Sequence, residues 1–113
     1  MSDFAFVYRG WDTPASPEEL QKTVDLWRAW FEELEQQGHL KDPGLPLDKS
    51  GNVVKGAKKL VSDGPFAEAK DVVGGFTLIT AADLRQATEL AKSCPILGAG
   101  GSVEVRPVLP FEM

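Results

Sequence analysis

"DFAFVYRG", residues 3–10, is the stretch that decides the fold. It is short, rich in aromatic and β-branched side chains, and closed by Gly10, which predicts a β-strand over about residues 3–9. Side chains alternate between the faces of a strand, so one face carries Phe4, Phe6 and Tyr8 and the other carries Ala5 and Val7. A strand that is apolar on both faces is buried on both. One layer of helices covers only one face, and we therefore expect a second subunit on the other.

The stretch "SPEELQKTVDLWRAWFEELEQQG", residues 16–38, predicts a long helix that ends at Gly38. Ser16 is the expected N-cap, Pro17 suits the first helical position, and Glu19 completes a capping box. Apolar residues then recur every three or four positions and form one stripe: Leu20, Val24, Trp27, Phe31 and Leu34. Leu26 and Trp30 lie beside this stripe, where we expect either a subunit contact or the wall of a pocket.

The remaining elements complete an alternating pattern. Residues 50–52 are the expected tip of a hairpin, and "FTLIT" (76–80) is a strand that follows two glycines. Asp83 starts a second helix that Pro95 stops, and "GSVEVRPVL" (101–109) is the last strand. The order predicts an α+β fold, a ferredoxin-like βαββαβ sandwich with an extra hairpin, as a single domain over residues 1–113.

Composition narrows the function classes. The net charge of −5 disfavours nucleic acid as a partner, and the one basic cluster is local: Lys49, Lys55, Lys58 and Lys59. No stretch is long and apolar enough to cross a bilayer, and the N-terminus lacks the pattern of a signal peptide. Cys94 is the only cysteine, so it forms no intramolecular disulfide. We expect a cytoplasmic protein.

Two residues are candidates for acid–base chemistry. Asp63 precedes Gly64 and Pro65, and its carboxylate either caps this turn or acts as a general acid or base beside apolar neighbours. His39, the only histidine, is either a catalytic group or an imidazole that interacts with the end of the preceding helix. One histidine with scattered carboxylates makes a poor zinc site, and we expect no metal and no cofactor.

A second group of residues is expected to bind a ligand. Arg9, Glu104 and Arg106 share a face if the first and last strands are neighbours, where they form either an anion site or an ordinary ion-pair network. The glycines at 98, 100 and 101 lead into a strand and not a helix, which excludes a phosphate loop. Cys94 is expected to be a buried small hydrophobic residue.

Three blocks in order give the chain a specific resemblance: "SDGPFAEAKDVVGGFTLI" (62–79), "CPI" (94–96) and "GGSVEVRPV" (100–108). With "FVYRG" (6–10) and "SPEEL" (16–20), they resemble the YCII-related, or DGPF-domain, family of small bacterial proteins. The resemblance implies a dimeric α/β barrel in which two ferredoxin-like sheets pack together.

The resemblance says less about activity. Some members carry a histidine in the first helix and an acid near a cleft, which suggests a His–Asp dyad, and one relative is a dehydrochlorinase that acts on chlorinated hydroxyquinols. The first helix of this chain has no histidine, and Trp27 or Trp30 occupies the comparable stretch, so the dyad is not carried over.

We therefore expect a homodimer with an aromatic-walled cleft that binds a small aromatic or anionic molecule. Asp63 and His39 are the catalytic candidates. The expected lining is Arg9, Trp27, Trp30, Phe66, Phe76 and Arg106. The alternative is a regulatory or interaction module with a protein partner, since members of the family are often encoded near sigma factors of the extracytoplasmic type.

Overall fold

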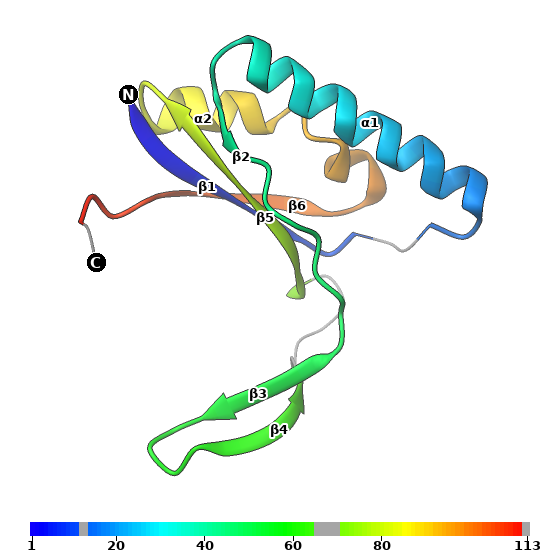
Figure 1. The fold of residues 1–113 in the computed structure, drawn as a ribbon, viewed down its shortest axis with the longest axis vertical. Helices are drawn as coiled ribbons and strands as arrows, with labels where there is room; N and C mark the ends of the chain where they lie inside the picture. The colour runs from blue at the N-terminus through cyan, green and yellow to red at the C-terminus, as the bar shows by residue number, and fades with distance from the viewer. Residues whose placement is uncertain (12–13, 65–70, 112–113) are drawn as a thin grey trace.

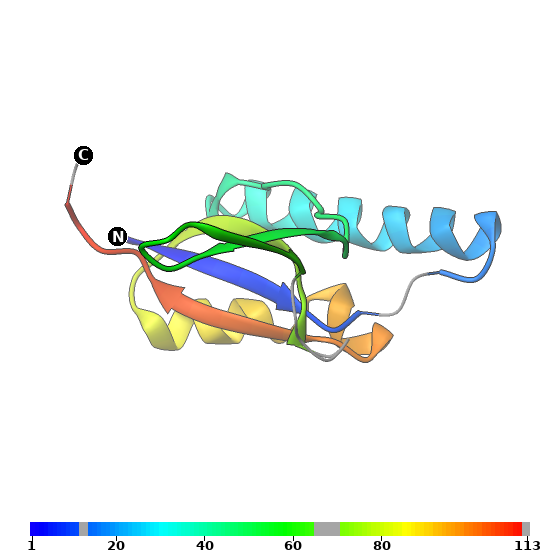
Figure 2. The same ribbon diagram turned by 90° about the horizontal axis from the view of Figure 1, so that it is seen from below.

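The computed structural model describes residues 1–11, 14–64 and 71–111. Four antiparallel strands form one sheet in the order β2-β5-β1-β6 (Figure 1). Their bounds are Ser2–Arg9 for β1, Leu40–Asp42 for β2, Val73–Ala81 for β5 and Ser102–Pro107 for β6. Helices α1 (Pro17–Gln36) and α2 (Leu84–Ala91) lie together on one face of this sheet (Figures 1 and 2). This is the ferredoxin-like arrangement, and the predicted fold is confirmed.

The extra hairpin consists of β3 (Gly51–Lys55) and β4 (Leu60–Gly64), which form a separate two-stranded sheet. We call residues 51–64 the arm. It is inserted between β2 and β5, and it projects from the body on the side opposite the helices (Figure 1). The expected tip at residues 50–52 is wrong. The chain turns between β3 and β4, where Gly56 and Lys59 have φ of 76° and 56°, because pairing of Val54 with Val61 sets the register.

Strand β1 determines which side chains are covered. Phe4, Phe6 and Tyr8 are all buried on the face that meets the helices. Their strand partners on that face are Ile79 and Thr77 of β5, and Val105 and Val103 of β6. The predicted alternation of this strand is therefore confirmed, and its second face, with Ala5 and Val7, is turned away from both helices.

An aromatic cluster joins α1 to β1. The Trp30 ring stacks on Phe6 with centroids 6.0 Å apart, and its indole Nε1–H donates to Ser93 Oγ at 2.9 Å. The rings of Trp27 and Tyr8 pack edge to face with centroids 4.8 Å apart, and the ring centroids of Trp27 and Trp11 are 5.8 Å apart. Such aromatic pairs stabilise a core by about 0.5–1.5 kcal/mol each beyond the burial of area.

The cluster corrects the predicted helix stripe. Trp30 is only 5 % exposed, so its expected place at a subunit contact is wrong. Leu20 and Val24, which were expected inside, are exposed at 51 % and 38 %. The reason is that the N-terminal half of α1 extends past the end of the sheet (Figure 1), so that no described strand lies beneath it. The predicted N-cap is confirmed, since Ser16 Oγ accepts from the Glu19 backbone N–H at 3.1 Å. The Glu19 carboxylate accepts from the Ala15 backbone N–H at 3.0 Å, one residue before the donor of a capping box.

A buried polar relay ties the loop before the arm to the core. The Tyr8 hydroxyl donates to Thr77 Oγ1 at 2.7 Å, and the Thr77 hydroxyl donates to the Pro43 carbonyl at 2.9 Å. Burial raises the pKa of Tyr8, which keeps the hydroxyl protonated as a donor. The relay therefore fixes the chain where it leaves β2 for the arm.

Gly44 lets this same loop approach β5 closely. Its φ is +69°, and a Cβ built on it would overlap the carbonyl oxygen of Phe76. Gly56 at the tip of the arm has a similar φ of +76°, but a Cβ there would meet nothing within 4 Å. The two glycines thus share a backbone conformation and differ in the space around them.

Gly44 and Gly56 give a matched test of how closely the loop at Gly44 approaches β5. We expect Gly56→Ala to lower the free energy of unfolding by about 1 kcal/mol, the cost of a left-handed conformation for a side chain with a Cβ. Gly44→Ala must also displace the loop from β5, and we expect a loss of at least about 3 kcal/mol. Urea unfolding monitored by tryptophan fluorescence measures both. Equal losses would show that the approach to Phe76 is not constrained.

Cys94 is buried in the core, as expected, and is 3 % exposed. Burial raises the pKa of its thiol from 9.0 to about 12. Above pH 9 the unfolded chain loses this proton while the folded chain keeps it. The unfolded state then binds fewer protons, so stability falls as the pH rises from about 9 to about 12.

A variant without the thiol isolates this contribution. Between pH 8 and pH 10, we expect the wild type to lose about 1 kcal/mol more unfolding free energy than Cys94→Ala. Comparing the two pH slopes removes the constant cost of the smaller side chain. Parallel slopes in urea titrations would contradict a raised thiol pKa.

Candidate functional site

The sheet has one face that no described helix covers, and we call it the free face. Its side chains come from alternate positions of the three longest strands: Asp3, Ala5, Val7 and Arg9 of β1, Phe76, Leu78 and Thr80 of β5, and Ser102, Glu104 and Arg106 of β6. The centre is apolar, with Phe76 40 % exposed opposite Val7. Charged groups surround this centre.

The charges lie in two groups. Lys41 Nζ contacts the Asp3 carboxylate. Glu104 lies between two arginines, with one carboxylate oxygen 3.9 Å from Arg9 Nε and the other 3.9 Å from Arg106 Nη1. These distances exceed those of good hydrogen bonds, and partly exposed pairs of this kind contribute at most about 1 kcal/mol. Glu104 therefore holds the two arginines only loosely.

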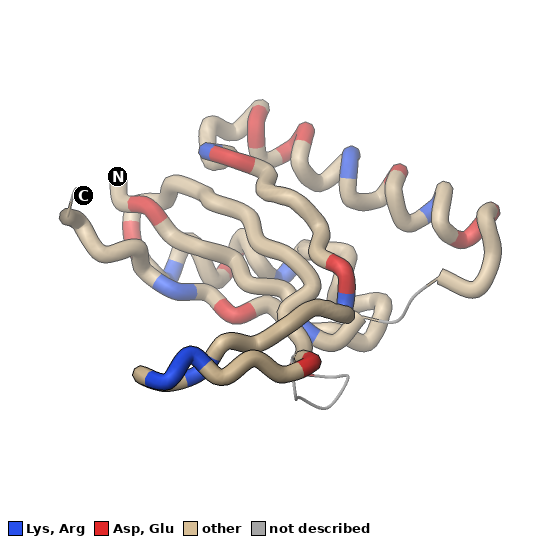
Figure 3. The backbone as a smooth tube through the Cα atoms, turned by 60° about the horizontal axis from the view of Figure 1, so that its bottom comes forward, with Lys and Arg blue, Asp and Glu red and all other residues tan. Residues whose placement is uncertain are grey.

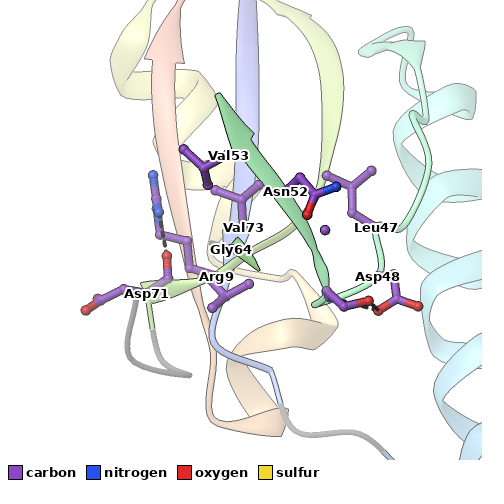
Figure 4. Close-up of a pocket in the computed structure, with 11 residues that line it drawn as sticks. Arg9, Leu47, Asp48, Asn52, Val53, Gly64, Asp71 and Val73 are labelled. Carbon is purple, nitrogen blue, oxygen red and sulfur yellow. Dashed lines mark hydrogen bonds between the residues drawn. The ribbon is translucent and has the colours of Figure 1, made fainter. Parts of the chain in front are cut away.

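An open pocket of about 550 Å³ lies where the arm joins the body (Figure 4). The body contributes Arg9 and the stretch from Asp71 to Val73, and the arm and its approach contribute Leu47, Asp48, Ser50 to Val53 and Gly64. Arg9 is oriented from one side, because its Nη1–H donates to the Asp71 carbonyl at 2.7 Å. Leu47 is positioned from the other, because its N–H donates to the Gly74 carbonyl at 2.9 Å.

The carboxylate of Asp48 forms hydrogen bonds within its own turn. Its Oδ1 accepts hydrogen bonds from the backbone N–H of Ser50 at 2.9 Å and from the Ser50 hydroxyl at 3.0 Å. These bonds favour the ionised form and lower the pKa of Asp48. Asp48 is therefore a turn residue that starts the arm and is poorly suited to proton transfer.

The structure brings several predicted residues to one region. Arg9 lines the pocket, and the pair of Val7 with Phe76 is the next pair along the same face. Arg106 points from β6 on this face. Asp63 is exposed on β4, its strand partner is Asn52, and its neighbour Gly64 lines the pocket.

Other predicted residues lie elsewhere or cannot be placed. Trp27 and Trp30 pack on the helix side, so the sheet separates them from Arg9 and Phe76. His39 Nδ1 lies 2.9 Å from the Thr80 carbonyl. Thr80 is seven residues along β5 from the pocket residue Val73, which is a separation of about 23 Å in a strand. Phe66, and Pro65 of the predicted Asp63 turn, fall outside the described residues. The catalytic and binding roles of all these residues stay predictions.

The arm side of the pocket was not predicted. Leu47, Asn52 and Val53 line it because the inserted hairpin leaves and rejoins the body at one edge of the sheet. A pocket at this place could be anticipated only by recognising that residues 40–42 are a strand and that the hairpin is inserted between two neighbours in the sheet.

The chemistry of the region favours an anion with an apolar body. A guanidinium binds carboxylate or phenolate oxygens through several N–H donors, and apolar walls suit a ring. Within residues 1–11, 14–64 and 71–111, no group of three or more His, Cys, Asp or Glu is placed to hold a metal ion. In the same ranges, no helix has the length and apolar character needed to cross a membrane.

Three comparisons with known proteins complete the description. The search of curated proteins found no match to the chain. A solved structure that matches is the 5-chloro-2-hydroxyhydroquinone dehydrochlorinase (TftG) from Burkholderia phenoliruptrix AC1100, in complex with 2,5-dihydroxybenzoquinone. It is 18 % identical, the match covers 94 % of this chain and 93 % of that one, and the TM-score is 0.44. The family model described as YCII-related domain matches residues 5–112, and the chain therefore belongs to the YCII-related domain family.

Proposed function

We propose that the protein binds a small aromatic anion at the arm end of the free face. The observation that carries this proposal is the position of Arg9, which lines the pocket and follows the apolar pair of Val7 with Phe76 along the same face of β1. The anionic group of the ligand binds Arg9, and its ring packs on Val73 and the apolar pocket wall.

The weak contact with Glu104 makes Arg9 available to such a ligand. A guanidinium carries five N–H donors, and the only side-chain hydrogen bond that the described residues show for Arg9 goes to the Asp71 carbonyl. A ligand carboxylate that approaches closer than 3.9 Å displaces Glu104 from its place beside Arg9. Glu104 is therefore a competitor of the ligand, and Arg106 is the second cation that retains it.

Asp63 is the carboxylate that we propose for proton transfer to or from this ligand. Its support is position alone, since Asn52 opposite it and Gly64 after it both line the pocket. A general acid or base must come within hydrogen-bond reach of the ligand, directly or through one water. His39 is the weaker candidate, because it lies toward the other end of β5.

We also propose that two copies associate through their free faces. Ala5, Val7, Phe76 and Leu78 form an apolar centre with a charged border, which is the composition of an interface core and its rim. A lasting contact of this kind buries more than about 1,000 Å² in total. The ligand pocket then lies at the edge of the contact.

The dimer proposal predicts the effect of a charge at its centre. We expect the wild type to scatter light as a dimer of the 12.3 kDa chain, and Val7→Lys to scatter as a monomer, because two like charges would be buried together. Arg85→Glu, an equally drastic change at an exposed position of α2, is the control and should remain dimeric. A wild type that is monomeric at micromolar concentration would refute the proposal.

The ligand proposal predicts opposite effects of two substitutions. In a thermal-shift screen of hydroxybenzoates, benzoates and phenols, a ligand at a hundred times its Kd stabilises the fold by about 2.7 kcal/mol. We expect Arg9→Ala to weaken binding of the best ligand by at least about tenfold, through loss of a charge-assisted hydrogen bond. Glu104→Gln should strengthen binding, because it removes the competing carboxylate.

Two further variants define the roles. Arg28→Ala on α1 is the matched control for Arg9 and should leave Kd unchanged. Asp63→Asn should leave Kd within about twofold and abolish turnover of any ligand that is converted. If no compound shifts the unfolding temperature, the site proposal is wrong, and the interaction module with a protein partner becomes the better hypothesis.

A further inference from the structure

The arm is the least supported element of the fold. Its two strands pair only with each other among the described residues. An isolated two-stranded hairpin is at best marginally stable in water. The arm nevertheless exposes three large apolar side chains to solvent, Val54, Leu60 and Val61, each about two-thirds exposed at 65 %, 66 % and 65 %. An extended, apolar and uncovered hairpin indicates a missing contact.

The position of the arm limits which surface the arm can contact. Figure 1 shows the arm on the side of the sheet opposite the helices, separated from the sheet. Figure 2, seen from that side, shows the arm in front of the sheet. The arm thus reaches over the space in front of the free face. Anything seated on the free face lies between the arm and the sheet.

The charge of the arm is opposite to that of the rest of the chain. Lys55, Lys58 and Lys59 gather at its free end (Figure 3), whereas the whole chain has a net charge of −5. Helix α1 alone carries six acidic and two basic residues. A basic tip on an acidic protein is complementary to a second copy of the same protein.

We propose that the arm of each protomer wraps around a second copy that is seated on its free face. Val54 and Val61, which share one face of the arm, pack on the second copy. The lysines at the tip meet the acidic surface there, of which α1 is the most acidic helix. This assignment rests on the proposed dimer. It goes further in naming the arm as a second, separate contact, so that each ligand pocket at the root of an arm lies beside the other copy.

Cross-linking between labelled copies tests the assignment directly. Protein grown with ¹⁴N and with ¹⁵N is mixed through unfolding and refolding, and a carbodiimide then joins lysines to nearby carboxylates without a spacer. We expect peptides that contain Lys58 or Lys59 to be joined to acidic peptides of the other isotope. Cross-links only within one isotope would mean that the arm folds back on its own sheet, and would overturn the proposal.

A matched pair of variants measures the contribution of the arm. We expect Val54→Ser with Val61→Ser, strand partners on one face of the arm, to raise the dimer Kd by at least about tenfold, as loss of buried anchors does. The control is Leu84→Ser with Leu97→Ser, which changes two side chains exposed at 48 % and 45 % near α2 and should leave Kd unchanged. The arm has no tryptophan, so the fluorescence of the core aromatic cluster shows whether each variant is folded.

The outcomes separate this proposal from the dimer itself. A wild type that is monomeric in analytical ultracentrifugation would refute the free-face dimer and the arm contact together. A dimeric wild type whose Kd the arm variant leaves unchanged would refute the arm contact alone. A dimeric wild type with a raised Kd in the folded arm variant and mixed-isotope cross-links supports both.

Discussion

Strand β1 is hydrogen-bonded along both edges, and the rest of the structure depends on this double pairing. Its register with β5 and β6 is fixed over six or more residues on each side. A slip by one residue would turn Phe4, Phe6 and Tyr8 away from the helices and bring Ala5, Val7 and Arg9 against them. The position of Arg9 at the pocket is thus fixed by the same hydrogen bonds that bury the core aromatics.

This constraint divides the molecule into a side that provides stability and a side that is available for binding. The helix side contains the stacked rings, the Tyr8–Thr77–Pro43 relay and Cys94, all buried. The free face has apolar side chains at its centre and loosely paired charges around them. Substitutions on the free face therefore carry little cost to folding, because few core contacts depend on them.

Local patterns predicted most of the fold and only one wall of the site. The alternation in residues 3–9 and the N-cap at Ser16 follow from short-range physics, and both are confirmed. The helix stripe failed at Leu20 and Val24, because periodicity says which residues share a face and not how far the sheet beneath them extends. The hairpin tip failed because Ser50, Gly51 and Gly56 all suit turns, and only cross-strand pairing distinguishes them.

The pocket could not be predicted from local patterns because it is made by an insertion. Arg9 reaches it from the end of β1, whereas Leu47, Asn52 and Val53 reach it from the hairpin and the segment before it, more than thirty residues later in the chain. The Thr77 hydrogen bond to Pro43 and the close approach of Gly44 to Phe76 hold the start of this insertion against β5. The shape of the pocket therefore depends on how the arm leaves the body, and any contact that fixes the arm also sets the opening of the pocket beside Arg9.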